Sequence, residues 1–107
     1  MSFSITNNGK ELDKSLYILD KNDKMFYTEM DNLNLDFSSI NGWTFSVGNN
    51  CTLYTGHFCT VNTGRNCLIF TYTDVVLQTD VYCEIYANRN LCTVKDTFKL
   101  IEIYKEK

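Results

Sequence analysis

The amino-acid sequence predicts an all-β fold, either an antiparallel β-sandwich or a compact barrel of about eight short strands. Segments rich in Ile, Val, Phe and Tyr alternate with clusters of Gly, Asn and Asp, which favour turns. Neighbouring apolar segments are separated by only three or four polar residues, the spacing of β-hairpins. No segment carries a helical period long enough for more than one or two turns of helix.

The composition is that of one folded domain. The chain has 107 residues, of which 44% are hydrophobic, 14% aromatic and 21% charged. A chain of this length supports one cooperative core, and its hydrophobic content exceeds that of disordered proteins. We therefore expect residues 1–107 to form a single β-sandwich domain.

Four hairpins follow one another along the predicted domain. Their turns are centred near Asn22, Asn49, Thr63 and Arg89. The segments that flank these turns are, in order, 15–20 with 24–29, 42–47 with 51–55, 57–62 with 67–73, and 80–87 with 91–94. Residues 97–104 alternate apolar and polar side chains and predict a closing strand. The expected topology is an antiparallel meander.

Two internal similarities accompany the hairpins. Residues 51–54 resemble residues 83–86 at an offset of 32, and residues 3–8 resemble residues 45–50 at an offset of 42. Because the two offsets disagree, a duplicated β-motif and a shared strand–turn composition explain the similarities about equally well.

The charge distribution bears on partners and location. Ten basic residues are scattered among thirteen acidic ones, for a net charge of −3, so the sequence lacks the basic stripe of a nucleic-acid-binding protein. No apolar run reaches the roughly 18 residues of a membrane span. The first fourteen residues lack the apolar stretch of a signal peptide. This favours the cytoplasm if Met1 is native, and secretion stays open if a leader was removed.

The cysteines leave two interpretations open. There are five of them, at Cys51, Cys59, Cys67, Cys83 and Cys92. Cys59 and Cys67 flank one predicted turn, and Cys51 and Cys59 flank Thr55-Gly56, so either pair is a candidate for a disulfide across a hairpin, although both cannot form together. The alternative is that all five are reduced and buried as small apolar side chains.

The sequence offers little for catalysis, so we expect no enzyme. His57, the only histidine, lies two residues before Cys59, which permits a thiol–imidazole pair or a zinc site on paper. There is no Cys-x-x-Cys pair, phosphate-binding loop or nucleophile elbow to support either. The seven tyrosines suit a carbohydrate or peptide groove, although cross-strand packing is their more usual role.

Residues 34–40, Asn-Leu-Asp-Phe-Ser-Ser-Ile, resemble the double-serine calcium motif of the βγ-crystallin superfamily. The resemblance implies a calcium site at Asn34, Asp36 and Ser38. In that site the Ser38 hydroxyl and the Asp36 backbone carbonyl would bind the ion, and Asn34 would shape the loop. Calcium is the one cofactor that the resemblance implies.

These observations predict a non-catalytic structural or recognition module, similar to the βγ-crystallins and with a weak or relict calcium site. The alternative is a secreted, disulfide-stabilised effector, such as an enzyme inhibitor or toxin, that acts through its turn loops. A protein or a carbohydrate is the expected partner. Exposed strand edges leave a homodimer open.

Overall fold

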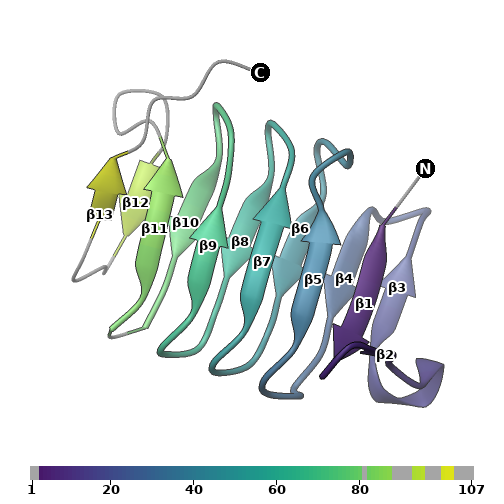
Figure 1. Cartoon of the computed structure of the whole chain (residues 1–107). Coiled ribbons are helices and arrows are strands. Elements are labelled where there is room, and N and C mark those ends of the chain that lie inside the picture. The colour runs from purple at the N-terminus through teal and green to yellow at the C-terminus, as the bar shows by residue number, and fades with distance from the viewer. Residues whose placement is uncertain (1–2, 81, 88–92, 96–99, 103–107) are drawn as a thin grey trace.

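The protein folds as a β-solenoid, as the computed structural model in Figure 1 shows for residues 3–80, 82–87, 93–95 and 100–102. The chain winds through about four turns, and each turn contributes one strand to each of two sheets. The all-β prediction is confirmed, whereas the antiparallel sandwich or barrel is wrong. Neighbouring strands come mostly from successive turns and therefore run parallel.

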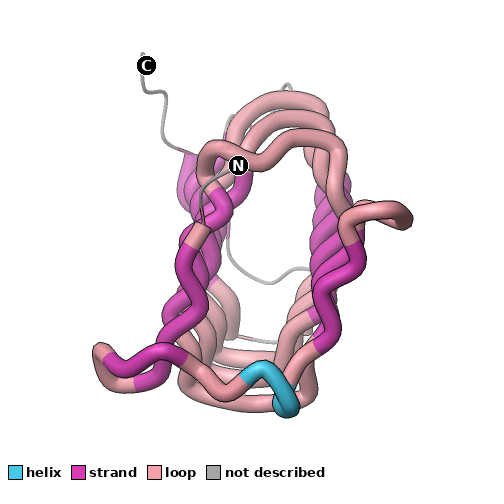
Figure 2. Tube along the Cα trace, turned by 90° about the vertical axis from the view of Figure 1, so that its right-hand side faces the viewer, coloured by secondary structure: helices cyan, strands magenta, loops and turns pink. Residues whose placement is uncertain are grey.

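Each sheet forms one wall of the solenoid (Figure 2). Sheet A has the order β13 (Leu100–Glu102), β11 (Glu84–Ala87), β9 (Leu68–Phe70), β7 (Thr52–Thr55), β5 (Asn34–Phe37), β1 (Ser4–Asn7) and β2 (Lys10–Glu11). Sheet B has the order β12 (Thr93–Lys95), β10 (Val76–Gln78), β8 (Thr60–Asn62), β6 (Thr44–Ser46), β4 (Met25–Tyr27) and β3 (Ile18–Asp20).

The central turns repeat every sixteen residues. In sheet B, Thr44 pairs in register with Thr60, and Thr60 with Val76. In sheet A, the register runs from Thr52 to Leu68 and on to Glu84. The similarity at an offset of 32 in the sequence therefore spans two turns of the solenoid.

Only one of the four predicted hairpins is confirmed within the described residues. Asn22 lies in the turn between β3 and β4, which pair antiparallel. Asn49 and Thr63 instead lie at corners, where the chain leaves a strand of sheet B and enters a strand of sheet A. The expected turn at Arg89 lies outside the described residues. The error arises because a left-handed residue, such as Asn50 with φ 56°, turns a strand through a corner as readily as it closes a hairpin.

The core lies between the two sheets and consists of stacked rows of equivalent side chains. One row, from sheet A, contains the fully buried Leu35, Leu53, Ile69 and Ile85. The row facing it, from sheet B, contains Phe26, Phe45, Val61 and Leu77. Successive residues of a strand point to opposite faces of the sheet. The residues that alternate with these buried ones therefore point outward and form the two outer faces of the solenoid.

The N-terminal end departs from the parallel repeat. β1 pairs antiparallel with both β5 and β2, and a short 3-10 helix, η1 (Lys14–Leu16), leads into β3. Phe3 stacks on Phe37 at 5.2 Å between ring centroids, and Tyr17 packs on Phe26 at 5.4 Å. These contacts cover apolar side chains of the first turn, as a terminal repeat does in solenoid proteins. None of the described helices is long and apolar enough to cross a membrane.

Candidate functional site: the outer face of sheet A

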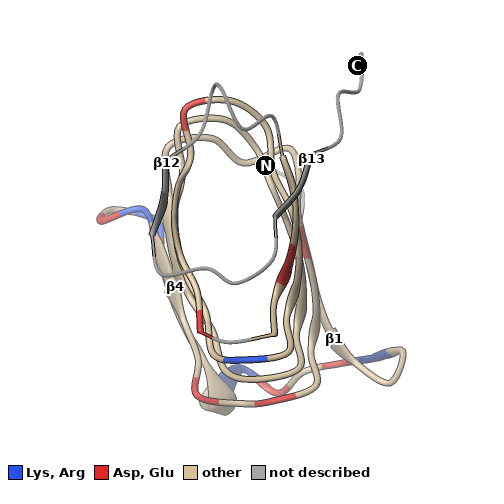
Figure 3. Ribbon diagram, turned by 90° about the vertical axis from the view of Figure 1, so that its left-hand side faces the viewer, with Lys and Arg blue, Asp and Glu red and all other residues tan. Residues whose placement is uncertain are grey.

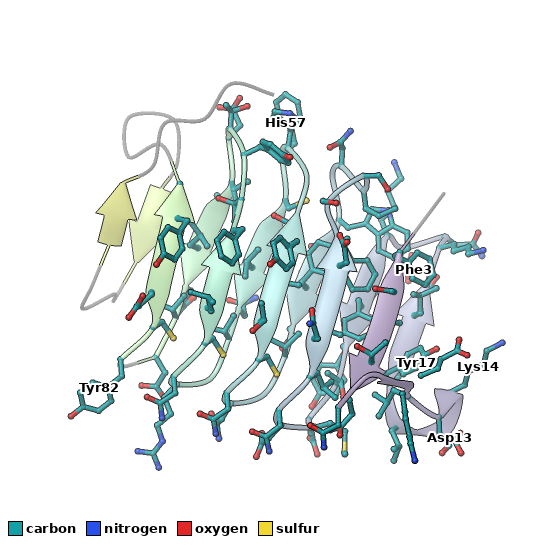
Figure 4. All side chains as sticks on the ribbon, viewed as in Figure 1. Phe3, Asp13, Lys14, Tyr17, His57 and Tyr82 are labelled. Atoms are coloured by element: carbon teal, nitrogen blue, oxygen red, sulfur yellow. The ribbon has the colours of Figure 1, made fainter. Side chains whose placement is uncertain are left out.

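A row of stacked aromatic rings crosses the outer face of sheet A. Tyr54, Phe70 and Tyr86 come from β7, β9 and β11, one from each strand, and they are partners in register. Their ring centroids are 4.7 and 4.8 Å apart, and the ring planes differ by only 8° and 10°. Sheet A, which carries these residues, is the front sheet in Figure 4. We call Tyr54, Phe70 and Tyr86 the aromatic ladder.

The rings of the aromatic ladder overlap only in part. Carbon atoms are in contact at about 3.5–4.0 Å, so parallel rings with centroids 4.7 Å apart are offset, as aromatic pairs prefer. Each offset leaves some of the ring surface uncovered. Tyr54 is 36% exposed, and Phe70 and Tyr86 are half-buried. The ladder therefore presents ring surface and phenolic hydroxyls to solvent, and the Tyr86 hydroxyl donates to the Glu84 carboxylate at 3.2 Å.

Few charges surround the ladder. Between Phe37 and Thr73 the sequence has one formal charge, that of Arg65, which lies at a corner between β8 and β9. In the end-on view of Figure 3, most of the ribbon along both walls is tan, the colour of uncharged residues. The outward positions of β7 and β9 are occupied by Thr52, Tyr54, Leu68 and Phe70. These positions on β7 and β9 carry no charge, whereas the carboxylates of Asp36 on β5 and Glu84 on β11 lie at the two ends of the ladder.

The residues of the predicted calcium site lie next to the aromatic ladder, on β5. Asn34 and Asp36 are exposed on the outer face, and Asp36 pairs in register with Tyr54. The Asp36 carboxylate accepts hydrogen bonds from the Ser38 backbone N–H at 3.1 Å and from its hydroxyl at 2.7 Å. Asp36 and Ser38 are thus together in a local turn, while Asn34 lies two residues away. Calcium binding stays a prediction, and no cluster of three His, Cys, Asp or Glu suited to a metal occurs among the described residues.

His57 and Cys59 do not form the thiol–imidazole pair that their spacing permits. The His57 imidazole lies at the corner after β7 (Figure 4), where its Nδ1 is 2.8 Å from the Thr73 hydroxyl and its ring stacks on Tyr72. The Cys59 thiol points into the core and donates to the backbone carbonyls of His57 and Ile40. Burial raises the pKa of Cys59, which is the opposite of what a nucleophilic thiol requires.

The cysteines follow the repeat rather than forming bridges. Cys51, Cys67 and Cys83 occupy equivalent positions at the corners leading into β7, β9 and β11, whereas Cys59 precedes β8 in the opposite sheet. All four are free and buried, so the predicted disulfides within this set are wrong, and Cys92 lies outside the described residues. Both suggested pairs combine cysteines from opposite corners of the solenoid. The disulfides expected for a stabilised effector are therefore not formed among these four cysteines.

The thiols of Cys51 and Cys67 shift each other's pKa. Interaction with the Cys67 side chain lowers the pKa of Cys51 to about 7. The same interaction, together with burial, raises the pKa of Cys67. Because Cys51 is only 1% exposed, this acidity does not by itself make it an accessible nucleophile.

The sequence contains a signal for the aromatic ladder. Each of Cys51, Cys67 and Cys83 is followed two residues later by Leu or Ile and three residues later by Tyr or Phe. The prediction of a carbohydrate or peptide groove rests on the tyrosines alone and does not include Phe70.

Comparison of the chain with protein families, with curated proteins and with solved structures finds no match.

Proposed function

We propose that this protein is a non-catalytic recognition module that contacts its partner through the aromatic ladder. The observation that supports this function is the row of parallel, partly uncovered rings on a face with few charges. Aromatic side chains are enriched in interfaces, and charged ones are depleted from interface centres. The corresponding outer row of sheet B begins with Tyr27 and continues through β6, β8 and β10 with the polar side chains Ser46, Asn62 and Gln78. A stable sheet in this solenoid therefore does not need an aromatic row.

The backbone beneath the ladder favours recognition as well. β7, β9 and β11 are joined by in-register parallel pairing, and the inward residues Leu53, Ile69 and Ile85 are fully buried. Side chains on such strands are held in place before a ligand arrives. Binding then loses little conformational entropy, which is the main benefit of a preorganised site.

Capture on immobilised protein tests the proposed function. Phe70→Asn removes the middle ring of the ladder. Asn is chosen because Asn62 occupies an outer position in β8 of sheet B. We expect wild-type protein to retain material from cell extracts and cell-surface fractions that the Phe70→Asn protein does not retain. Asn62→Ala, on the opposite face, is the matched control and should behave as wild type. Equal retention by all three folded proteins would contradict the proposal.

A further inference from the structure

We propose that the ligand of the aromatic ladder is an uncharged polysaccharide that lies along the solenoid axis across β7, β9 and β11. This inference rests on the proposed function and names its ligand class. It depends on three properties of the face: its polarity, its geometry and its size.

The polarity of the face matches a neutral, hydroxyl-rich polymer. Sugar rings combine apolar C–H groups, which contact aromatic surface, with hydroxyls that both donate and accept hydrogen bonds. The ladder offers uncovered ring surface together with the phenolic hydroxyls of Tyr54 and Tyr86, and Thr52 adds a third hydroxyl on the same face. Binding sites of this kind combine aromatic area with a few polar groups that fix orientation.

The geometry matches an extended chain rather than a compact ligand. The three rings form a straight row perpendicular to the strands, because their residues are in register on adjacent strands. Successive rings are evenly spaced and nearly parallel, with centroids 4.7 and 4.8 Å apart and ring planes that differ by 8° and 10°. A polymer that lies along this row meets an equivalent ring at each step.

The size and charge of the face argue against other partners. Three side chains, two of them half-buried, present a small part of the about 800 Å² that each partner buries in a stable protein complex. This argues against a protein partner and against a second copy of the chain. A nucleic acid would need basic side chains along its path, whereas Arg65 is the one basic residue between Phe37 and Thr73.

Affinity electrophoresis in native gels tests the ligand class directly. The gels would contain hydroxyethyl cellulose, mixed-linkage β-glucan, galactomannan, xylan or dextran, with polygalacturonate and heparin as anionic comparisons. We expect at least one neutral polymer to slow the wild-type protein and the anionic polymers not to. Tyr54→Ser should weaken that binding about threefold to tenfold, as expected for the loss of one aromatic contact.

Two further variants control for folding and for position. Tyr54→Phe keeps the ring and should retain most of the binding, whereas Asn62→Ala should bind as wild type. Retardation that is equal in wild-type and Tyr54→Ser proteins would overturn the inference, because the polymer would then bind elsewhere. Retardation by none of the neutral polymers would overturn it as well.

The two proposals fail in different ways. If neutral polymers do not bind but ladder-dependent capture from extracts persists, and survives periodate treatment of the extract, the ligand class is wrong and the recognition face stands. If capture does not depend on Phe70, the recognition face itself is wrong.

Discussion

At the residue scale, two aromatic side chains occupy a backbone conformation that rarely suits them. Phe58 has φ 61° and Tyr82 has φ 63°, in the left-handed region. Asn50 and Asn66 take the position of Tyr82 in the preceding turns, and Asn tolerates this region well. Phe58 and Tyr82 are also 65% and 71% exposed (Tyr82 is labelled in Figure 4), so little burial offsets the strain.

Replacing Tyr82 with Asn should stabilise the protein. The change relieves the left-handed strain of an exposed aromatic residue, and we expect the free energy of unfolding to rise by roughly 0.5–1 kcal/mol. Urea denaturation measures the change through its midpoint. The reverse substitution in the preceding turn, Asn66→Tyr, should lower stability by a similar amount. An unchanged or lower midpoint for Tyr82→Asn would show that the Tyr82 ring makes a stabilising contact.

Cys59 should contribute to a loss of stability at alkaline pH. Burial raises the pKa of its thiol above the usual 9.0, so above about pH 9 the unfolded chain releases a proton that the folded chain retains. The folded state then binds more protons, and the free energy of unfolding falls as pH rises. Cys59→Val removes this effect and substitutes the residue found one turn later at Val75. Urea unfolding at pH 8 and pH 10.5, with reductant present, should show a smaller loss in the variant; equal losses would contradict the assignment.

At the element scale, the corners between strands are linked by side chains that accept amide protons from the next turn. The Asp31 carboxylate accepts from the Asn49 N–H at 2.9 Å, and the Asn49 side-chain oxygen accepts from the Arg65 N–H at 2.9 Å. In the opposite corner, the Asn41 side-chain oxygen accepts from the His57 N–H at 2.8 Å. Each corner therefore binds the corner stacked on it, as the strands do.

Asn49 is the residue through which this arrangement can be tested. Asn49→Ala leaves the Arg65 N–H without its acceptor, and we expect a loss of about 1 kcal/mol in the free energy of unfolding. Asn49→Asp keeps the acceptor and should retain most of the stability, since Asp31 does the same in the preceding turn. Thermal unfolding compares the two variants, and amide hydrogen exchange at Arg65 should quicken only in Asn49→Ala. Equal stability of both variants with wild type would exclude a role for this contact.

The positions of the strands were easier to predict from the sequence than the pairing between strands. Alternation of apolar and polar residues marks a strand in a solenoid as it does in a hairpin, so the all-β prediction was confirmed. The corner at Asn49 and the true hairpin at Asn22 contain the same residue types. They differ in that the Asp20 carboxylate accepts the N–H groups of Asn22 and Asp23 within one hairpin, whereas Asn49 accepts from a residue sixteen positions later. A contact over that distance leaves no local sign in the sequence.

The candidate site was predictable only in part, for a related reason. The predicted groove includes Tyr54 and Tyr86, but their alignment depends on the register that places Phe70 between them. The offset of 32 was visible because residues 51–54 and 83–86 are alike. The intermediate turn at residues 67–70 has Leu at the position of Thr52 and Phe at the position of Tyr54, which obscured the period of sixteen.

At the scale of the whole molecule, stability depends on each turn packing against its neighbours. Leu53 lies between Leu35 and Ile69 in the core row of sheet A, and all three are fully buried. A side chain in this row supports the turn on either side of it. Solenoid stability is accordingly a sum of contributions from the repeats and from the interfaces between them.

Leu53→Ala should therefore weaken the central turns strongly. We expect a loss of about 2–5 kcal/mol in the free energy of unfolding, the range for removing a buried leucine. Thr52→Ala, a neighbouring substitution on the outer face of β7, should change stability by no more than about 0.5 kcal/mol. Urea denaturation of the two variants measures the difference. Similar effects for both would contradict the assignment of Leu53 to the core.

The sixteen-residue repeat also determines which insertions the solenoid can accommodate. An insertion of one residue into a central turn would exchange inward and outward side chains in the strand that follows. An insertion of a whole turn, such as a second copy of residues 59–74, would instead extend every row at once. The copied segment contains Cys67 and Phe70, so the row of rings would gain one member and lengthen by about 4.8 Å, the spacing of neighbouring strands. The solenoid and its row of rings would thus lengthen together, by one turn for each duplicated segment.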